Sequence, residues 1–368
     1  MNKVIIMPDS FKGSITSNEA TDILSNVVQK YITPNIIKLP IADGGEGSTD
    51  CILRIKGGIK KETLVHSPDQ QIIHACIGVL EDNTAIIELA ESSGITKQDC
   101  LHPLDSNTYG FGELIKFALD CGYRKFYLCL GGSASTDCGC GMAKALGIEF
   151  YDSNNQSFIP SGGTLSKINR IDFSNLDKRI QESKFTIMSD VTNPLYGTLG
   201  AAYIYGPQKG ASLEQIQLLD EGLMHVSKLI EEKTQVSPTL EGAGAAGGTG
   251  YGCVAFLNAE IVSGIDGLLN LCNFDSMLED CSLIVTGEGC LDEQSLMGKV
   301  LSGIRKHAKD IDIVSFCGKC KVSKEELKTK HITAIEIAPN IPLEESIKNG
   351  KYYLEQSAEQ YFKACKKM

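Results

Sequence analysis

The chain has 368 residues, of which 42% are hydrophobic, and a formal net charge of −11. Such a length usually makes two domains, because a single hydrophobic core stops growing at about 250–300 residues. The acidic balance with scattered Lys and Arg disfavours nucleic acid as a partner, and no apolar run approaches the ~18–20 residues of a membrane span.

The chain begins with a predicted strand-loop-helix unit. Val4–Met7 is apolar and short, as a buried strand should be, and a loop of residues 8–14 follows it. Thr16 with Glu19 three residues later is a capping-box pattern, which predicts a helix from there to about Lys30.

A second unit of the same kind follows. The strand Ile36–Ile41 leads into the loop 42–47, and a helix runs to about Lys56. Both loops carry charged side chains at the carboxyl end of a strand, which is where open α/β sheets bind ligands.

The pattern then changes to segments with alternating polar and apolar residues. Glu62–Val65, Ile72–Leu80 and Thr84–Leu89 are separated by turn residues, so they predict an antiparallel meander. A helix over Gly112–Cys121 leads into the stretch around which we expect the rest of the chain to be arranged.

That central stretch is Lys125–Met142. Its apolar run Phe126–Leu130 predicts a strand covered on both faces, and two glycines then allow a sharp turn into a helix. Backbone N–H groups and the positive end of a helix dipole suit an anion, so we expect phosphate here. An ordinary strand-to-helix turn with a good cap is the alternative.

Strands and helices alternate through the rest of the chain. The strand Phe185–Ser189 ends at Asp190, a glycine-broken run covers 197–210, and a long helix covers Leu213–Lys233. The most glycine-dense stretch is Glu241–Tyr251. The last third is predicted as helix near 265–271, strand 282–286, loop 287–289, helix 298–309, strands 311–316 and 331–337, and helices 344–348 and 352–366.

Fourteen cysteines, in a chain that starts Met1-Asn2-Lys3 and then enters a strand rather than a signal peptide, indicate reduced thiols and a cytoplasmic protein. Cys317-x-x-Cys320 has the spacing of a redox or zinc pair. Zinc prefers four ligands, however, and the chain has no second such pair, so metal or redox use is the minor alternative.

Several predicted strands end in a glycine-flanked charged residue, a mixture that phosphoryl transfer needs. The Gly-x-x-x-x-Gly-Lys-Ser/Thr signature of P-loop enzymes is absent. Gly242-x-Gly244-x-x-Gly247 matches the dinucleotide fingerprint by letter, but the polar segment 234–240 before it contains Pro238 and is no convincing strand. A dinucleotide-dependent oxidoreductase is therefore an alternative, and a non-catalytic small-molecule sensor is a second one.

Taken together, these loops resemble the type I glycerate kinase family, from Lys3 to about Gly350. The shared motifs are long and occur in the same order. They are Pro8-Asp9-Ser10-Phe11-Lys12-Gly13, Ala42-Asp43-Gly44-Gly45-Glu46-Gly47, Tyr109-Gly110, Gly131-Gly132-Ser133-Ala134 with Asp137, Asp190-Val191 with Asn193-Pro194-Leu195, Gly206-Pro207-Gln208-Lys209-Gly210, Gly242–Gly248, and Thr286-Gly287-Glu288-Gly289 with Leu291-Asp292. Four positions depart from the family pattern: Thr136 stands for Asn, Cys138 for Gly and Cys290 for Arg, and Phe111 stands where a small polar residue is common.

The resemblance implies an α/β fold of two domains, one Rossmann-like with a parallel sheet and one mixed α/β, with the active cleft between them. We expect residues 1–60 plus 275–368 in the first domain and 61–274 in the second. It further implies an ATP- and Mg²⁺-dependent kinase that phosphorylates D-glycerate, usually giving 2-phosphoglycerate. Its partners are thus a small-molecule substrate and ATP, without nucleic acid or membrane, and the pattern assigns no oligomeric state.

On this basis each candidate residue has an expected role. Asp190 is the general base, and Lys12 and Lys209 contact phosphate or carboxylate. The metal candidates are Asp43, Glu46 and Glu288. The substrate and phosphate candidates are Asp9, Ser10, Gly131, Gly132, Ser133 and Asp137.

Overall fold

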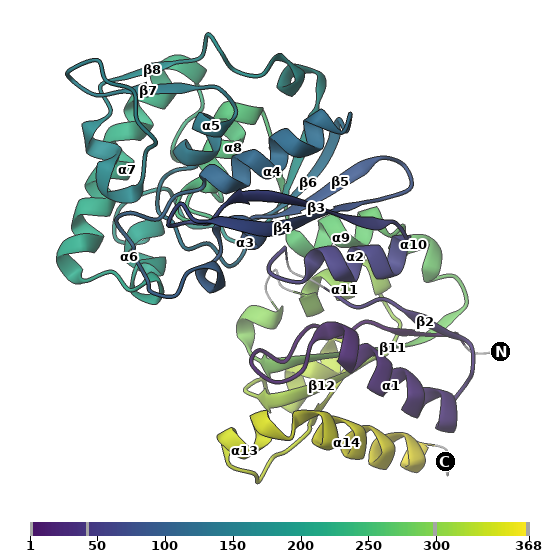
Figure 1. Ribbon diagram of the computed structural model, residues 1–368. Helices are drawn as coiled ribbons and strands as arrows, with labels where there is room; N and C mark the ends of the chain where they lie inside the picture. The colour runs from purple at the N-terminus through teal and green to yellow at the C-terminus, as the bar shows by residue number, and fades with distance from the viewer. Residues whose placement is uncertain (1–2, 42–43, 297–299, 366–368) are drawn as a thin grey trace. The chain divides into compact units, whose positions relative to one another are not determined.

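The structure is a computed structural model that describes residues 3–41, 44–296 and 300–365 (Figure 1). Its contacts separate the chain into two compact units. Met1–Asp43 and Ile265–Met368 form one, here called the terminal unit, and Gly44–Gly264 form the other, here called the central unit. The predicted limits lay at 60/61 and 274/275. Segment 44–60 groups with the central unit because its helix α2 (Ser48–Lys56) contacts β4 (Ile72–Val79) and β5 (Thr84–Glu88).

The terminal unit is built on a five-stranded parallel sheet in the order β13-β12-β11-β1-β2. Its strands are β1 (Lys3–Ile6), β2 (Ile36–Lys38), β11 (Cys281–Leu291), β12 (Ile313–Cys320) and β13 (Ile332–Glu336). Val4 and Ile6 share a core with α1 (Ser17–Tyr31) and α14 (Gly350–Cys365), which lie side by side on one face (Figure 1). Ile5 alternates to the other face and is also fully buried. A parallel sheet covered on both faces confirms the predicted Rossmann-like unit.

Local sequence signals set the helices of this unit. The capping box at the start of α1 is confirmed, since Glu19 N donates to Thr16 Oγ1 and Thr16 N donates to the Glu19 carboxylate. The remaining helices of the terminal unit, with α9 starting at the boundary, are α9 (Gly264–Leu271), α10 (Phe274–Met277), η5 (Glu293–Leu296), α11 (Val300–Ala308), α12 (Lys324–Thr329) and α13 (Leu343–Lys348).

One predicted loop is wrong. Residues 287–289 were expected to leave the strand at 286, but β11 continues to Leu291. The strand continues because Gly287, Glu288 and Cys290 stay in register with Phe316, Cys317 and Lys319 of the long neighbouring strand β12. Pairing with a neighbour distant in sequence has outweighed the turn preference of the two glycines.

The central unit is built on a mixed six-stranded sheet in the order β10-β9-β6-β5-β4-β3. Its other strands are β3 (Ile59–His66), β6 (Lys125–Cys129), β9 (Lys184–Met188) and β10 (Glu260–Val262). The pairs β3-β4 and β4-β5 are antiparallel, which confirms the predicted meander, and the remaining pairs are parallel. The predicted fold class of one parallel and one mixed α/β unit is thus confirmed.

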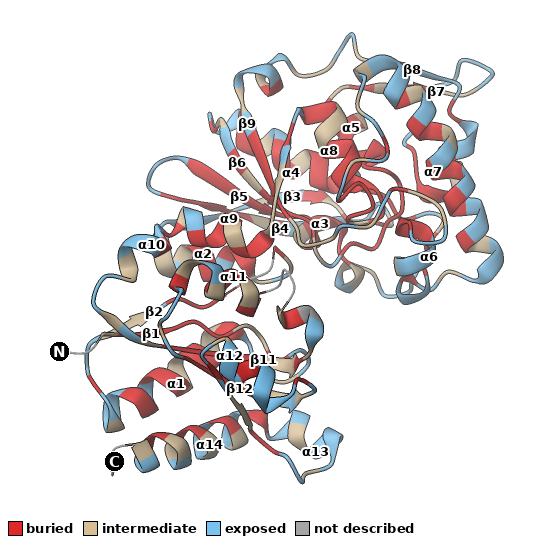
Figure 2. Ribbon diagram, turned by 180° about the vertical axis from the view of Figure 1, so that it is seen from behind, coloured by how far each residue is buried: buried red, intermediate tan, exposed pale blue. Residues whose placement is uncertain are grey.

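Helices cover this sheet and bury its core (Figure 2). They are α3 (Ala90–Ser93), η1 (Ile95–Lys97), α4 (Tyr109–Asp120), α5 (Cys140–Ala145), η2 (Gly162–Lys167), η3 (Lys178–Glu182), α6 (Ala201–Tyr205), η4 (Pro207–Lys209), α7 (Leu213–Thr234) and α8 (Thr249–Leu257). A small antiparallel pair that the sequence pattern did not predict, β7 (Glu149–Tyr151) with β8 (Arg170–Asp172), completes the unit.

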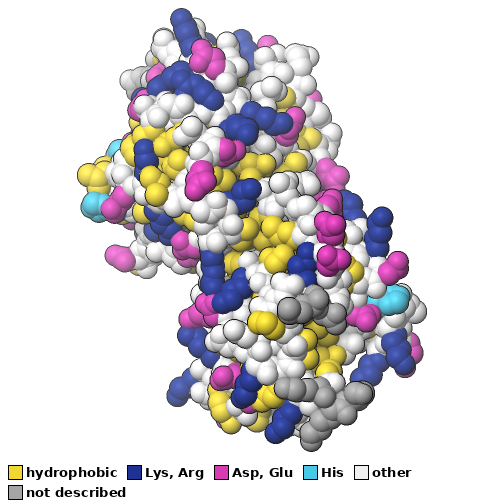
Figure 3. Space-filling view, turned by 90° about the vertical axis from the view of Figure 1, so that its right-hand side faces the viewer, with side chains coloured by type: hydrophobic (Ala, Val, Ile, Leu, Met, Phe, Trp, Pro, Cys, Tyr) yellow, Lys and Arg dark blue, Asp and Glu magenta, His cyan; other side chains and the backbone are white. Residues whose placement is uncertain are grey.

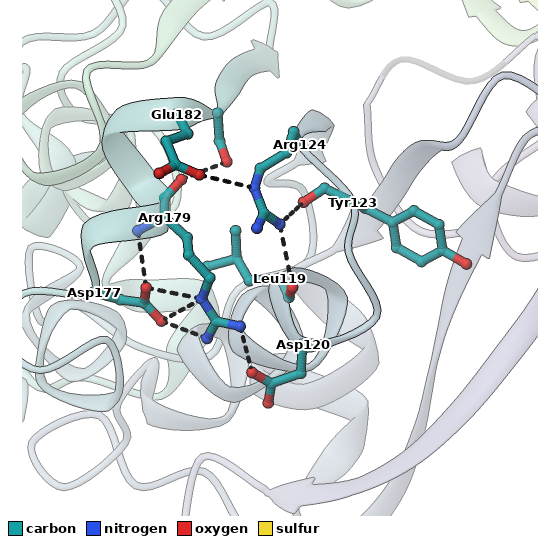
Figure 4. Close-up of polar contacts among 8 residues, drawn as sticks. Leu119, Asp120, Tyr123, Arg124, Asp177, Arg179 and Glu182 are labelled. Atoms are coloured by element: carbon teal, nitrogen blue, oxygen red, sulfur yellow. Dashed lines mark hydrogen bonds and ion pairs between the residues drawn. The ribbon is translucent and has the colours of Figure 1, made fainter.

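Two arginines fasten the end of α4 to η3 (Figure 4). Arg179 forms ion pairs with Asp177 at 2.6 Å and with Asp120 at 2.7 Å. Arg124 donates to the backbone oxygens of Leu119 and Tyr123 at 3.2 and 2.8 Å. The arginine pairs lower the pKa of the Asp177 carboxyl and raise that of the Arg179 guanidinium. A cation at the carboxyl end of α4 also interacts favourably with the helix dipole.

The surface mixes both charges. On the face shown in Figure 3, Lys and Arg side chains are interspersed with Asp and Glu instead of forming one basic patch. Within the described residues, the structure contains no helix with the length and apolar character to cross a membrane.

Candidate active site

The loop after β6 is wrapped around one buried carboxylate. Asp137 is fully buried and accepts hydrogen bonds from five donors. These are Thr108 N at 2.8 Å, Thr108 Oγ1 at 2.7 Å, Gly141 N at 3.1 Å, Ser135 Oγ at 3.2 Å and Gly139 N at 3.3 Å. Burial raises the pKa of the Asp137 carboxyl, and hydrogen bonds from Thr108, Gly141 and Gly139 oppose that rise. Asp137 therefore holds the loop together from inside.

Two neighbouring amides of this loop, those of Gly132 and Ser133, have no acceptor among the residues that the structure describes. The N–H of Gly131 donates to Gly44 O at 3.1 Å. Among the described residues no acceptor takes the N–H of Gly132, which is exposed, or of Ser133 next to it. Gly132 adopts φ +80°, a conformation that favours glycine. Adjacent backbone donors of this kind form a site for an anion.

Lys209 lies behind the same loop. It ends the short helix η4, is buried, and donates from Nζ to the backbone oxygen of Ser135. Burial lowers the pKa of its ammonium to about 8, and the nearby Asp137 carboxylate opposes that shift. Lys209 thus supplies a buried positive charge to the loop instead of reaching out to solvent.

A second glycine loop packs against the first. Gly247 O accepts from Cys138 N at 3.1 Å, and a Cβ on Gly247 would lie 2.1 Å from Ser135 O. Only glycine fits here, since real Cβ contacts are never so short. The run 242–248 follows no strand, because it lies between α7 and α8, so the dinucleotide fingerprint lacks the structural context that it requires.

Asp190 follows β9 and contacts the two residues that follow β10. Its Oδ1 accepts from Ser263 Oγ at 2.8 Å and from Gly264 N at 2.9 Å, which fixes the orientation of a half-buried carboxylate. The chain after Asp190 meets the second glycine loop, where Gly244 N donates to Asn193 O at 2.9 Å. Asp190 and the loop after β6 are therefore connected through residues 242–247.

The loop 44–47 joins the same edge of the sheet. A Cβ on Gly131 would lie 2.5 Å from Gly45 Cα, and one on Gly44 would lie 2.3 Å from Met188 O, so these backbones touch. Glu46 in this loop is exposed. Asp43, a predicted metal ligand, lies outside the described residues. Segments that are far apart in sequence thus contact one another within the central unit. They carry the predicted site residues Glu46, Asp137, Asp190, Lys209 and those of the glycine loops.

The terminal unit brings the other candidates together. Asp9 N donates to Gly287 O at 2.8 Å, so the loop after β1 rests on β11. Ser10 N donates to Asp9 Oδ1 at 2.6 Å, and Lys12 is exposed with its backbone beside Gly289. Glu288 accepts from the buried Ser295 Oγ at 2.6 Å, which orients its carboxylate.

Sequence reasoning missed three residues that hold these loops. Thr108 binds Asp137, Ser263 binds Asp190, and the buried Glu88 accepts from the backbone of the 44–49 segment. Glu88 was visible as an acidic residue at the end of a predicted apolar strand. Thr108 and Ser263 carried no comparable signal, because both are ordinary residues beside turns.

A model of the glycerate kinase family matches residues 4–366 of this chain. The chain belongs to the glycerate kinase family. A glycerate kinase from Halalkalibacterium halodurans is 38% identical over 97% of each chain, and a glycerate 2-kinase from Escherichia coli is 38% identical over 83% of this chain and 82% of its own. A crystal structure provisionally assigned as glycerate kinase 2 of Salmonella typhimurium LT2 superimposes with a TM-score of 0.83 at 31% identity, covering 100% of this chain and 98% of its own.

The positions that depart from the family pattern have distinct surroundings. Cys138 stands for glycine and keeps a left-handed φ of +59°. Thr136 is buried, and its Oγ1 has no hydrogen-bond partner in the described part of the chain. Cys290 is half-buried on β11 beside Lys319.

Proposed function

We propose that this member of the glycerate kinase family transfers the terminal phosphoryl group of ATP to D-glycerate and produces 2-phosphoglycerate. The observation that carries the proposal is the pair of amides at Gly132 and Ser133, which no described acceptor occupies, in a loop connected to the fixed carboxylate of Asp190. Amide donors suit phosphate oxygens, and a fixed carboxylate suits the proton of an attacking hydroxyl. The names of two relatives, glycerate kinase and glycerate 2-kinase, support glycerate as the phosphoryl acceptor.

Each candidate then has a role in the reaction. Asp190 accepts the proton of the attacking hydroxyl, and the amides of Gly132 and Ser133 bind phosphate oxygens. Asp137 and Lys209 hold the loop, and the buried charge of Lys209 acts on phosphate through it. In the terminal unit, the exposed Lys12 with Asp9 and Ser10 contributes a second polar loop for nucleotide or substrate. Phosphoryl transfer depends mainly on such positioning and charge stabilisation.

The residues also suit Mg²⁺. Glu46 and Glu288 offer carboxylate oxygens, and Ser295 already orients Glu288. Mg²⁺ is usually bound by one or two carboxylates together with substrate phosphates and water, so a preformed protein cage is unnecessary. The described residues contain no cluster of three or more such ligands. Each of these carboxylates is a candidate ligand within its own unit, as is Asp43, and the ion would offset phosphate charge when bound.

Turnover with a defined product tests the proposal. The enzyme is assayed with Mg²⁺, ATP and D-glycerate by coupled ADP release, and ³¹P NMR identifies which hydroxyl is phosphorylated. We expect ADP formation that depends on D-glycerate and a single 2-phosphoglycerate signal. ADP release without any phosphorylated glycerate, or no turnover together with NADH binding, would overturn it.

Lys209 predicts a pH dependence. As pH rises through about 8, its ammonium loses the proton and the loop loses its buried charge, so kcat/KM should fall. The unfolded chain keeps this proton up to its ordinary pKa of 10.5, so the cost of burying the ammonium, fully present below pH 8, is relieved as pH rises from about 8 to 10.5, and this group's effect on stability increases with pH there. The fall is therefore not unfolding caused by Lys209. In Lys209→Met we expect low kcat/KM without the fall near pH 8, and an unchanged profile would contradict the assignment.

The cysteines support a reducing compartment, and we propose a cytoplasmic location. The fourteen cysteines form no disulfide in the described part of the chain. Burial raises the pKa of the thiols of Cys140, Cys253 and Cys317, which makes them poor nucleophiles. Thiol titration of the freshly purified protein should find reduced cysteines.

A further inference from the structure

Glu88 is a buried carboxylate to which the reaction assigns no role. It is the last residue of β5 and is 4% exposed. Its neighbour in the sheet is Cys129, the last residue of β6, so Glu88 lies beside the start of the glycine loop. Burying a carboxylate is costly unless strong hydrogen-bond donors surround it, so the donors around Glu88 indicate which part of the chain it holds.

Both oxygens of Glu88 bind the backbone of one segment. Oε2 accepts from Gly47 N at 2.9 Å, and Oε1 accepts from Thr49 N at 2.6 Å. These amides belong to the first turn of α2, whose N-cap Gly47 has no side chain to cap the helix and adopts φ +87°. Glu88 therefore supplies the cap from a strand that is 41 residues away in sequence.

The same segment contacts the phosphate loop. Three residues before Gly47, Gly44 O accepts from Gly131 N at 3.1 Å, and the backbone of Gly44 lies against Met188 O. On the other side, Leu89 N donates to Cys129 O at 2.8 Å, and a Cβ on Gly132 would lie 3.2 Å from the Ala90 side chain. One carboxylate thus connects the loop 44–47 to the strand pair that carries the Gly132 and Ser133 amides.

We propose that Glu88 is a positioning residue of the active site, which holds the loop 44–47 in place beside the amides of Gly132 and Ser133. The inference rests on the proposed function, since that loop carries Glu46, one of the carboxylates assigned to Mg²⁺. Its charge matters as much as its shape, because both of its oxygens face N–H donors. A neutral amide at this position presents one NH₂ group to an N–H donor and loses one of the two bonds.

The test compares Glu88→Gln with Glu62→Gln. Glu62 lies on β3 of the same sheet, is exposed, and among the described residues pairs only with an exposed histidine. Glu62→Gln is therefore the same substitution at a position that anchors no loop. Hydrogen exchange of the Gly47 and Thr49 amides measures the anchoring itself. Calorimetric binding of the non-hydrolysable nucleotide AMP-PNP with Mg²⁺ measures its consequence.

We expect Glu88→Gln to accelerate hydrogen exchange at residues 47 and 49 by about tenfold or more and to weaken AMP-PNP binding by a similar factor. Hydrogen exchange of the α4 amides should not change. Glu62→Gln should change neither. Glu88→Asp keeps the charge but is one methylene shorter, so it should recover part of the binding. Unchanged exchange, or faster exchange with wild-type nucleotide affinity, would overturn the inference. Failure of the proposed function is separate, because it shows in the wild-type enzyme as absent glycerate turnover.

Discussion

We expect that replacing Asp190 with asparagine lowers kcat by about 10³-fold, within the usual range for loss of a general base. The expected cause is specific. An asparagine at 190 keeps an oxygen for the hydrogen bonds from Ser263 Oγ and Gly264 N, so the side chain stays in place, but it accepts no proton. Steady-state kinetics with ATP and D-glycerate give kcat and KM separately, and KM should change little.

Two further variants make this result decisive. Asp82→Asn is the same change at an exposed residue in the turn between β4 and β5, and it should leave kcat unchanged. Ser263→Ala removes only the hydroxyl that orients Asp190, so a loss of about tenfold is expected, smaller than that of the base itself. If Asp190→Asn retained wild-type kcat, another group would have to accept the proton.

We expect that replacing Asp137 with asparagine lowers the free energy of unfolding of the central unit by about 3–5 kcal/mol, because it leaves buried donors without an acceptor. Asp137 accepts from five donors at 2.7–3.3 Å, and an NH₂ group would face some of them. Urea-induced unfolding followed by circular dichroism measures the loss, since the chain has no tryptophan. The loop should also lose its hold on Lys209, so kcat falls with stability.

Asp177→Asn is the matched control for this second prediction. Asp177 also accepts a backbone N–H and pairs with Arg179, but it lies near the surface at η3 (Figure 4). Partly exposed ion pairs and caps contribute about 1 kcal/mol, so the same substitution should cost far less there. Equal losses at 137 and 177 would show that burial of the Asp137 network is not what stabilises the loop.

Local patterns were sufficient for most elements of the fold. The Thr16–Glu19 capping box, the three alternating segments and the apolar run at 126–130 each depend on neighbours within a few residues, and each element was confirmed. The errors have a different cause. β11 runs past its glycines to Leu291, and β7 pairs with β8, because the partner strands are far away in sequence.

The candidate site divides in the same way. Glycines next to charged residues at strand ends marked the loops, because such residues combine a tight backbone turn with a reactive side chain. The sequence did not separate the residue that faces a ligand from the residue that holds it in place. Asp137 and Lys209 were grouped with the contact residues, whereas both are buried and directed at the loop.

The chain's own residues thus determined the α/β alternation, the places of the candidate anion-binding loops and the family, because these depend on short patterns and on the chemistry of the residue types. Tertiary structure alone decided which backbone N–H groups are hydrogen-bonded within the described chain and which can still donate to a ligand. Thr108 reaches Asp137 across 29 positions and Glu88 reaches Gly47 across 41. A hydrogen bond at such separation forms only when packed strands bring its two groups together, and no local pattern encodes that meeting.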